Sequence, residues 1–456
     1  MADPARTDRT IATPDFRANR EQFDLFGIKE PGPAVFLARL TASIRRRTSL
    51  TFYLLLVSLC IFIASLLSVP STIAMGNKPP ASKRDAAQNR TPSDLESLLV
   101  KSLLEVRQNR LDVALKDIDS LLNSYPTFKL AHLIRGDLLL ARAHPLSTIG
   151  NATGATQQQT DLRDEARARL RRYLEQMPVN RVPKYLVQFQ PGQHYAVVVD
   201  TGKSRLYLFQ NDNGTPRYVS DFYITSGKAG AEKVKEGDQK TPLGVYFVTA
   251  SLPRTRISDF YGTGAFPINY PNEWDRRQGK NGHGIWLHGV PSNTYSRPPR
   301  ASSGCVVLAN PDLDRLAKDL QVGLTPVIIS DQVEWVDAKE LAAQRSLLDQ
   351  RVEDWRRDWE SIDSDKYLRH YSKSFSAPGQ NFRSWNEQKR QVNAGKSWVK
   401  VKLSNMSIFG YPGNENMMVV TFDQDYSSNN LKNQMRKRQY WKLENNEWKI
   451  IFEGAA

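Results

Sequence analysis

Residues 48–77 contain no charged side chain, and this stretch constrains the fold more than any other feature of the chain. Its apolar centre, 50–69, reads LTFYLLLVSLCIFIASLLSV. A helix of that length rises about 30 Å, which is the thickness of the hydrocarbon core of a bilayer. Arg45, Arg46 and Arg47 directly precede the stretch, and such charges stay on the cytoplasmic side. The sequence therefore predicts one signal-anchor helix over 48–74, with its N-terminus in the cytoplasm.

The segments on either side of this predicted helix are polar and contain prolines. Residues 1–47 include four prolines and one short apolar cluster, which is typical of a disordered cytoplasmic tail. The tail is longer than the n-region of a cleaved signal peptide, so we expect the helix to remain as an anchor. Residues 75–92 are expected to form a polar linker. The sequence thus predicts a single-pass protein of a bacterial inner membrane, with everything after the linker in the periplasm.

The chain is basic, with a net charge of +15 over 456 residues. This balance favours acidic partners, namely anionic lipid, anionic wall polymer or nucleic acid, although a solvated basic surface explains it equally well. The sequence shows no stripe of Lys and Arg interleaved with aromatic residues, as nucleic-acid binders have. We therefore expect no nucleic-acid partner.

Two cysteines are present, Cys60 within the apolar stretch and Cys305 far downstream. A cysteine held in lipid cannot form a disulfide with one in the exported part of the chain. In an oxidising compartment, a single soluble cysteine suggests a thiol that is kept for chemistry. A small buried hydrophobic residue is the alternative interpretation, so the neighbours of Cys305 have to decide between the two.

After the linker, apolar residues recur at helical spacing and predict a helical region over 93–178. Within it, Ala114, Pro126 and Gly136 are spaced like the corresponding residues of a tetratricopeptide repeat, in which small side chains let helix pairs pack closely. The region resembles about one and a half such units, and an ordinary helical hairpin is an open alternative. A repeat-like surface of this kind implies protein partners in the cell envelope.

Two further regions follow. Short runs with a period of two, separated by turns that carry glycine, predict a β-rich domain over 190–331. From 341 to 456, a helix that carries Trp355 and Trp359 precedes strand-like segments that start at Tyr367. This order resembles the SnoaL-like cone fold, a small α+β domain that serves binding or dimerisation. We expect these aromatic residues to form its core.

Two segments of the β-rich region carry the chemistry: GHGIWLHG at 282–289 and SSGCVVLAN at 302–310. A thiol such as that of Cys305 is only a few per cent thiolate at neutral pH, so it needs a base. The imidazole of His288 can take the thiol proton and later return it to a leaving amine, which is worth roughly 10²–10⁴ in rate. Gly304 lets a substrate carbonyl approach the backbone, where N–H groups can bind a developing oxyanion.

These segments resemble the catalytic domain of L,D-transpeptidases of the YkuD type, whose signature is His-Gly followed by Ser-x-Gly-Cys. His288 and Cys305 lie 17 positions apart, as that signature requires. Residues 241–246, TPLGVY, resemble the TPxG-aromatic turn of the family, and 225–227 resemble the strand end before it. Residues 269–276 resemble a segment that borders the cleft in one branch of the family.

The resemblance implies that Cys305 is the nucleophile and His288 its base. The carbonyl of Gly289 would orient the imidazole, while Gly304 and the Cys305 amide would line the oxyanion site. Ser302 holds the place of the serine in the motif.

Two positions depart from the pattern of the family. Ser303, within the same turn, stands where many members have His, and Val307 stands where many have Arg. An Arg two positions after the nucleophile can pair with a substrate carboxylate or brace the site, whereas Val cannot. The departures fit a branch that includes hydrolases of peptidoglycan–protein links as well as crosslinking enzymes.

Four more residues are candidates for substrate contact: Tyr261, Asn272, Arg276 and His283. Tyr261 lies in a segment with several glycines that could form a lip over the cleft, although a plain surface loop is an alternative. His283 would face away from His288 on a regular strand, and a bend between them could change that. The other histidines lack metal-ligand spacing, so we predict no metal and no cofactor.

The family resemblance implies ping-pong acyl transfer on the stem peptides of peptidoglycan. Cys305 would attack the L-centre carbonyl of the diamino acid in a tetrapeptide and expel D-Ala, and an amine would then take the acyl group. With water as acceptor the enzyme would be an L,D-hydrolase, either a carboxypeptidase or a cleaver of peptidoglycan–protein links. A non-catalytic envelope scaffold is a third hypothesis. The first two imply roles in peptidoglycan biosynthesis, cell-wall organisation and cell shape.

Overall fold

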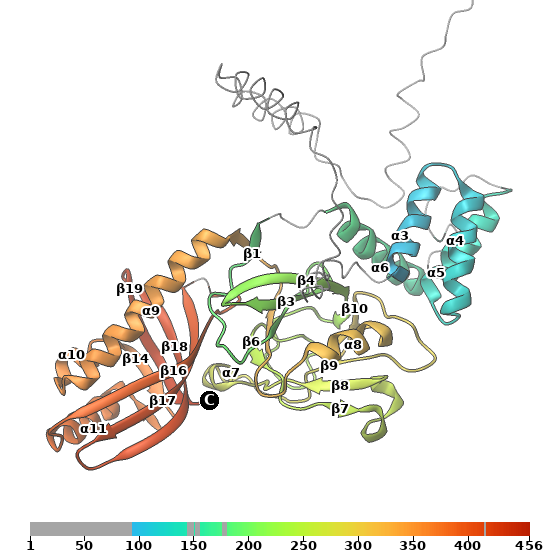
Figure 1. Cartoon of the computed structure of the whole chain (residues 1–456). Coiled ribbons are helices and arrows are strands. Elements are labelled where there is room, and N and C mark those ends of the chain that lie inside the picture. Colours follow the sequence, from blue (N-terminus) through green and yellow to red (C-terminus); the bar gives the residue numbers. More distant parts are fainter. Residues whose placement is uncertain (1–93, 144–149, 151–155, 176–179, 415) are drawn as a thin grey trace, which may run out of the picture. The chain divides into compact units, whose positions relative to one another are not determined.

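The computed structural model describes residues 94–143, 150, 156–175, 180–414 and 416–456 (Figure 1). They form a helical region (94–175), a middle domain (180–337) and a C-terminal domain (338–456). The predicted tail, signal-anchor helix and linker, over 1–92, lie outside the described residues. Within the part of the chain that is described, no helix is both long and apolar enough to cross a membrane.

The helical region consists of helices that pack side by side, each through one buried face. Its described helices are α3 (Asp94–Arg107), α4 (Leu111–Ser124), α5 (Lys129–Leu140) and α6 (Gln157–Leu174). On α4 the buried residues include Ala114, Ile118 and Leu121, which share one helix face. The hydroxyl of Ser102 on α3 donates to the carbonyl oxygen of Ala114 at 3.1 Å, so the two helices approach closely at this small residue. The resemblance of the region to a tetratricopeptide repeat stays a prediction.

The larger sheet of the middle domain has the order β4-β3-β2-β12-β6. Its strands are β2 (Tyr195–Asp200), β3 (Arg205–Asp212), β4 (Thr215–Tyr223), β6 (Gly244–Phe247) and β12 (Pro326–Ser330). The central strand β2 is buried on both faces, with Val197 and Val199 in one apolar core and Ala196 and Val198 in another. A strand covered on both sides has an uninterrupted apolar sequence, which explains the run AVVV.

A second sheet of the middle domain has the order β11-β9-β8-β7. Its strands are β7 (Leu252–Pro253), β8 (Gly264–Pro267), β9 (Trp286–His288) and β11 (Val306–Val307). β9 pairs with β8 in antiparallel and with β11 in parallel orientation. Leu287 and Val306 of this sheet are fully buried and share an apolar core with Val197 of the first. This core holds the ends of β9 and β11 in a fixed position.

Shorter elements complete the middle domain. They are β1 (Arg181–Pro183), β5 (Ser226–Gly227), η3 (Arg254–Arg256), η4 (Asp259–Tyr261), α7 (Glu273–Arg277), β10 (Arg300–Ser302), α8 (Asn310–Leu316), η5 (Ala317–Asp319) and β13 (Trp335–Asp337). β10 lies parallel to β5, and β1 lies antiparallel to β13. The prediction of a β-rich domain after the helical region is therefore confirmed, with the helices confined to short connections.

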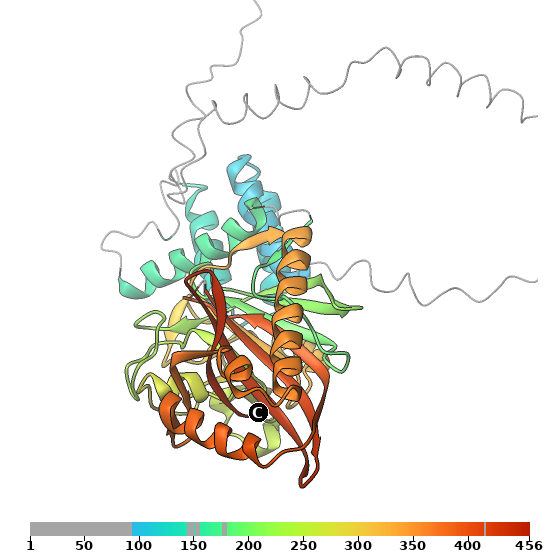
Figure 2. The same cartoon turned by 90° about the vertical axis from the view of Figure 1, so that its left-hand side faces the viewer.

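The C-terminal domain is a strongly bent sheet in the order β15-β14-β19-β18-β17-β16, with helices packed on it. Its elements are α9 (Ala338–Glu360), α10 (Ser364–Leu368), β14 (Tyr371–Ala377), β15 (Gln380–Asn381), α11 (Phe382–Ala394), β16 (Val399–Gly410), β17 (Met417–Ser428), β18 (Lys432–Glu444) and β19 (Glu447–Ala455). α9 runs along the long strands (Figure 2), where Trp355 and Trp359 are buried against the sheet as predicted. Tyr367, expected in a strand, ends up in α10, because Asp363 caps a short helix there.

The middle and C-terminal domains share a continuous apolar core. Phe409 of β16 meets Phe189 and Phe247 of the middle domain, with ring centroids 6.1 and 6.4 Å apart. The backbones of Gln188 and Ile408 exchange two hydrogen bonds of 2.9 Å. Because this core contains residues of both domains, neither can separate without exposing apolar surface to water.

Candidate active site

His288 is the last residue of β9, and the strands on both sides fix its position. It pairs with Ala265 of β8 and with Val307 of β11. Its side chain is buried, and Nδ1 lies 2.7 Å from the carbonyl oxygen of Gly289. Since a carbonyl oxygen only accepts, Nδ1 carries the proton in this hydrogen bond. The neutral imidazole therefore keeps the lone pair of Nε2 free to act as a base.

Cys305 directly precedes β11 and is partly exposed. In the parallel pair, Val307 lies opposite His288. Cys305 stands two positions before Val307, so the nucleophile candidate enters the strand that lies next to His288. The thiol donates to the carbonyl oxygen of Gly284 over 3.3 Å. The structure thus brings the predicted nucleophile and base to neighbouring strand ends.

Burial moves both pKa values toward the neutral forms. It lowers the pKa of His288 to about 4, although the hydrogen bond to Gly289 opposes this shift. It also raises the pKa of the Cys305 thiol, against the opposing effects of the Trp286 backbone and the positive charge of Arg297. At neutral pH the site is therefore expected to rest as a neutral thiol beside a neutral imidazole.

The turn before Cys305 is braced by hydroxyl groups. The amide of Gly304 donates to Ser302 Oγ at 3.1 Å, and that hydroxyl donates to the carbonyl oxygen of Cys305 at 2.7 Å. Thr241 of the TPxG turn donates its hydroxyl to the Gly304 carbonyl at 3.0 Å. Because the Gly304 amide is already engaged, the Cys305 amide is the better candidate for oxyanion binding. Ser303 is exposed at the tip of the turn.

Gly304 is required by its surroundings. Its φ of +124° lies in a region that L residues rarely adopt, and an added Cβ would lie 2.6 Å from the carbonyl oxygen of Lys240. The glycine therefore lets the turn before the nucleophile pack against the segment after β5. This role adds to the access for substrate that the sequence suggested.

An aromatic lip lies over the imidazole. Tyr261 packs against His288 and Trp286, with ring centroids 5.1 and 4.7 Å away. Phe260, which is 52% exposed, lies 6.1 Å from the His288 ring. Of the four predicted substrate contacts, Tyr261 is thus the one that touches a predicted catalytic side chain.

The lip is fastened by Asn310 at the start of α8. Its side-chain oxygen accepts from the backbone amides of Thr263 and Val290, and its amide nitrogen donates to the Val290 carbonyl at 2.9 Å. A Cβ at Gly289 or Gly262 would lie 2.1 Å from that side-chain oxygen. Gly289 is therefore needed both for its carbonyl and for its lack of a side chain.

The other three predicted substrate contacts lie elsewhere. His283 is exposed outside β9 and pairs with Glu236 at 3.6 Å. The buried side chain of Asn272 caps α7, accepting from the Asp275 amide at 2.8 Å and donating to the Val245 carbonyl at 3.0 Å. These bonds give Asn272 a structural role in place of substrate contact.

Arg276 is exposed and donates to the Pro271 carbonyl at 2.5 Å. Its helix α7 faces the C-terminal domain, where Trp274 stacks on Tyr440 with ring centroids 5.7 Å apart. Part of the segment 269–276 thus serves the contact between domains, and its place at the border of the cleft stays a prediction. Glu273 of the same helix forms an ion pair with Arg438 at 3.1 Å.

Arg297 is the residue near the site that sequence reasoning missed. Its guanidinium carbon lies 4.8 Å from the centroid of the Phe260 ring, and its charge acts on both Cys305 and His288. It stands in the segment SRPPR, where prolines remove any periodic signal. The signal that could have identified it is a basic residue close to the nucleophile in a chain that lacks the usual Arg at Val307.

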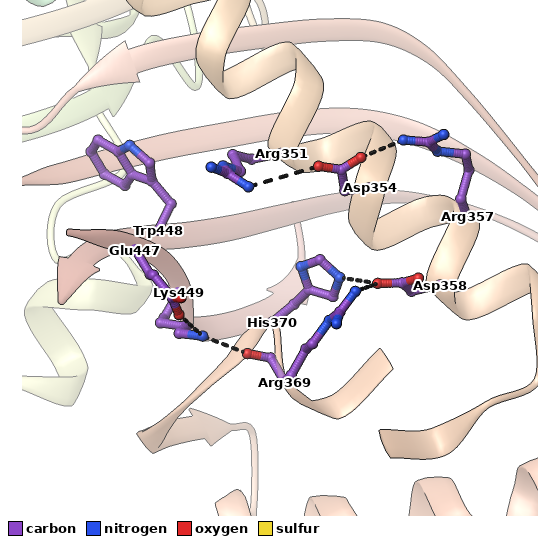
Figure 3. Close-up of a pocket in the computed structure, with 9 residues that line it drawn as sticks. All are labelled: Arg351, Asp354, Arg357, Asp358, Arg369, His370, Glu447, Trp448 and Lys449. Carbon is purple, nitrogen blue, oxygen red and sulfur yellow. Dashed lines mark hydrogen bonds and ion pairs between the residues drawn. The ribbon is translucent and has the colours of Figure 1, made fainter. Parts of the chain in front are cut away.

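A surface hollow of about 590 Å³ lies in the C-terminal domain, away from this chemistry. Most of its charged residues pair with one another (Figure 3). Asp358 of α9 accepts from His370 at 2.7 Å and from Arg369 at 3.1 Å. Asp354 pairs with Arg351 at 3.8 Å and also with Arg357. Glu447 and Lys449 form a further ion pair, so every charged residue that lines the hollow has a partner of opposite charge.

Comparison with known proteins identifies two parts of the chain. Residues 194–329 match the model of the L,D-transpeptidase catalytic domain (YkuD). Residues 347–454 match the Cds6 C-terminal NTF2-like domain, which bears out the predicted SnoaL-like fold. No curated protein sequence matches the chain.

Among solved structures, Bd1075 of Bdellovibrio bacteriovorus is 32% identical, with a TM-score of 0.54. The similarity covers 60% of this chain and 98% of Bd1075. The chain belongs to the YkuD family of L,D-transpeptidase catalytic domains. Pgp2 of Campylobacter jejuni, described as a helical cell shape determining protein, is 26% identical with a TM-score of 0.51. That similarity covers 59% of this chain and 93% of Pgp2.

Proposed function

We propose that this YkuD-family chain is a peptidoglycan L,D-transpeptidase that forms a thioester on Cys305. One observation carries the proposal: Cys305 directly precedes β11, which pairs in parallel with β9 at His288, and the Nδ1 proton of His288 is held by Gly289. This leaves Nε2 as the base for the thiol. The family suggests the substrate, a stem tetrapeptide of peptidoglycan.

In the first half-reaction, His288 Nε2 takes the thiol proton while Cys305 Sγ attacks the L-centre carbonyl of the diamino acid. The carbonyl oxygen becomes an oxyanion, which the Cys305 amide stabilises. The C–N bond to D-Ala then breaks, and the imidazolium gives its proton to the departing amine. Because both groups start neutral, proton transfer accompanies attack, and no thiolate has to form beforehand.

In the second half-reaction, an amine from another stem peptide attacks the thioester. His288 takes a proton from that amine and returns it to the thiolate as the C–S bond breaks. The products are a new amide crosslink and the free thiol. The aromatic lip of Phe260 and Tyr261 lies beside His288, where it can exclude competing water from the thioester.

A second candidate is an L,D-hydrolase on the same site, with water as the acceptor. Two observations favour it. The buried, apolar Val307 stands where many members place Arg, and the Cys305 side chain is partly exposed to solvent. The product would be a tripeptide stem or a cleaved peptidoglycan–protein link.

The cellular setting follows from the predicted anchor helix over 48–74. We infer that it holds the chain in a bacterial inner membrane with the YkuD domain in the periplasm, facing the wall. The helical region and the NTF2-like domain are then available for envelope proteins. A role in cell shape is supported by the similarity to Pgp2 over 59% of the chain.

Incubating the full-length protein with tetrapeptide muropeptides tests the proposal through the products. Crosslinked dimers together with released D-Ala are expected from the transpeptidase, and tripeptides without dimers from the hydrolase. Cys305→Ala is expected to abolish both products while the protein stays folded. Turnover by this variant would remove the nucleophile assignment, and an unreactive wild-type protein would favour the scaffold hypothesis.

A further inference from the structure

Arg297 packs on Phe260 of the aromatic lip, and its positive charge acts on both the thiol of Cys305 and the imidazole of His288. It is half-buried, and its guanidinium carbon lies 4.8 Å from the centroid of the Phe260 ring, which lies 6.1 Å from the ring of His288. The described residues place no carboxylate within ion-pair distance of it, whereas the half-buried Arg172, for example, pairs with Asp221. A cation that is partly withdrawn from water without a partner is available to an anionic ligand.

The backbone around Arg297 is held on the side of the middle domain. Its carbonyl oxygen accepts from the hydroxyls of Tyr223 and Thr225, each at 3.0 Å. The carbonyl of Pro299 accepts from the amide of Ser226 at 2.8 Å. These bonds fix the position from which the guanidinium projects.

The helical region holds the residues just before Arg297. Tyr295 is buried against Tyr125 and Phe128, with ring centroids 4.8 and 4.4 Å away. Ser296 donates its hydroxyl to the buried carboxylate of Glu165 at 2.6 Å. The segment that carries Arg297 is therefore held in place by residues of two parts of the chain.

We propose that Arg297 binds the substrate carboxylate next to the scissile bond, namely the free C-terminus of the stem tetrapeptide. This inference rests on the proposed function. In such a substrate only the amide nitrogen and one α-carbon separate the attacked carbonyl from the terminal carboxylate. An anion so close to the attacked carbonyl lies within reach of a cation beside the thiol. Arg297 thereby supplies, from a different loop, the charge that Val307 lacks.

The first test compares two substrates that differ in one group. For the wild-type protein, kcat/KM is expected to be about 10- to 100-fold higher for a tetrapeptide with a free C-terminus than for the same peptide as its C-terminal amide. A ratio of this size corresponds to the free energy of one hydrogen bond between charged groups. Arg297→Gln is expected to lose this preference, because the rate with the carboxylate falls and the rate with the amide changes far less. Arg297→Lys should restore part of it.

Arg300→Gln is the matched control, since Arg300 is an exposed residue of the same segment. It removes the same charge and should keep the wild-type preference. If Arg297→Gln lowered kcat/KM equally for both substrates, Arg297 would be a positioning residue of the loop, and the carboxylate proposal would be overturned.

The second test does not depend on peptidoglycan. Iodoacetate and iodoacetamide alkylate thiols by the same displacement and differ by one carboxylate. The rate with iodoacetate is divided by the rate with iodoacetamide, and peptide mass mapping locates the alkylation at Cys305. This ratio should fall several-fold in Arg297→Gln and stay unchanged in Arg300→Gln. If the ratio responds but no peptide is turned over, the anion site stands and the proposed function fails. If the ratio does not respond, the anion site is refuted.

Discussion

The middle domain is joined to its two neighbours by interfaces that contain both apolar and charged contacts but in different proportions. Toward the C-terminal domain the contact is an apolar core in which Phe409 is fully buried. Toward the helical region it is a network of buried charges, where Arg205 donates two hydrogen bonds to Glu96 at 2.7 and 3.0 Å. Apolar burial is non-directional and strong, whereas a buried ion pair gains little net stability but tolerates no missing partner.

This difference has a consequence for the active site. The apolar interface fixes the domain as a scaffold, while the charged interface supports the segment that carries Arg297, through Glu165 and Ser296. We therefore expect changes in the first to affect stability and changes in the second to affect both stability and substrate selection.

Phe409→Ala should have the largest effect. The side chain is fully buried between Phe189 and Phe247, so its removal should lower the free energy of unfolding by about 3–5 kcal/mol. Urea-induced unfolding followed by tryptophan fluorescence measures this loss, and raising the salt concentration should not change it. A loss below about 1 kcal/mol would show that the two domains do not share a core.

Arg172→Met is the matching change in the charged interface. Arg172 donates to both oxygens of the buried Asp221, at 2.8 and 2.6 Å, so its loss leaves a buried carboxylate with fewer donors. The free energy of unfolding should fall by about 1–3 kcal/mol. The exposed pair of Lys203 and Glu175 provides the control, since Lys203→Met should cost less than about 1 kcal/mol. An equal loss of unfolding free energy in Arg172→Met and Lys203→Met would contradict the distinction between buried and exposed ion pairs.

Asp312→Asn should change how stability depends on pH. Burial, together with the negative charge of Glu96, raises the pKa of Asp312 to about 6. Its contribution to stability is therefore fully present below the unfolded pKa near 3.8 and is lost as the pH rises through 6. Between pH 5 and 7 the wild-type protein should lose about 1 kcal/mol from this group, and the variant should not. Parallel pH profiles of the thermal midpoint in the two proteins would refute this assignment.

The sequence predicted more of the active site than of its surroundings. Cys305, His288 and the carbonyl of Gly289 could be predicted because they stand in short motifs on neighbouring strands. Arg297 could not, because its position depends on Tyr295, whose partners Tyr125 and Phe128 lie in the connection between α4 and α5, far away in the sequence.

The fold shows the same contrast. The apolar stripes of α4 and β2 were visible in the sequence, whereas α11 was not predicted. Its sequence, FRSWNEQKRQVNA, is amphipathic but mostly polar, and only Trp385 and Asn393 of it are buried, so a search for runs of apolar residues passed over it. Asn272 was misjudged because a polar residue near a cleft motif serves equally well as a helix cap.

The acid limb of the pH–rate profile tests the assignment of His288 as the base. Because the pKa of the imidazole is lowered to about 4, the neutral base is present at pH values well below its usual 6.5. The rate of acylation should therefore stay high down to about pH 5 and fall only near pH 4. An acid limb centred at 6.5 would mean that the imidazole is more exposed to water than the structure shows.

The central claim is that Cys305 becomes acylated with the help of His288, and the mass of the intact protein after incubation with a carbapenem tests it most directly. The strained lactam of the carbapenem acylates a nucleophile without needing an acceptor. The wild-type protein should gain the mass of one carbapenem on Cys305, His288→Gln should do so roughly 10²–10⁴ times more slowly, and Cys305→Ala should gain none. An adduct that forms equally on Cys305→Ala, or none on the wild-type protein after prolonged incubation, would contradict the account.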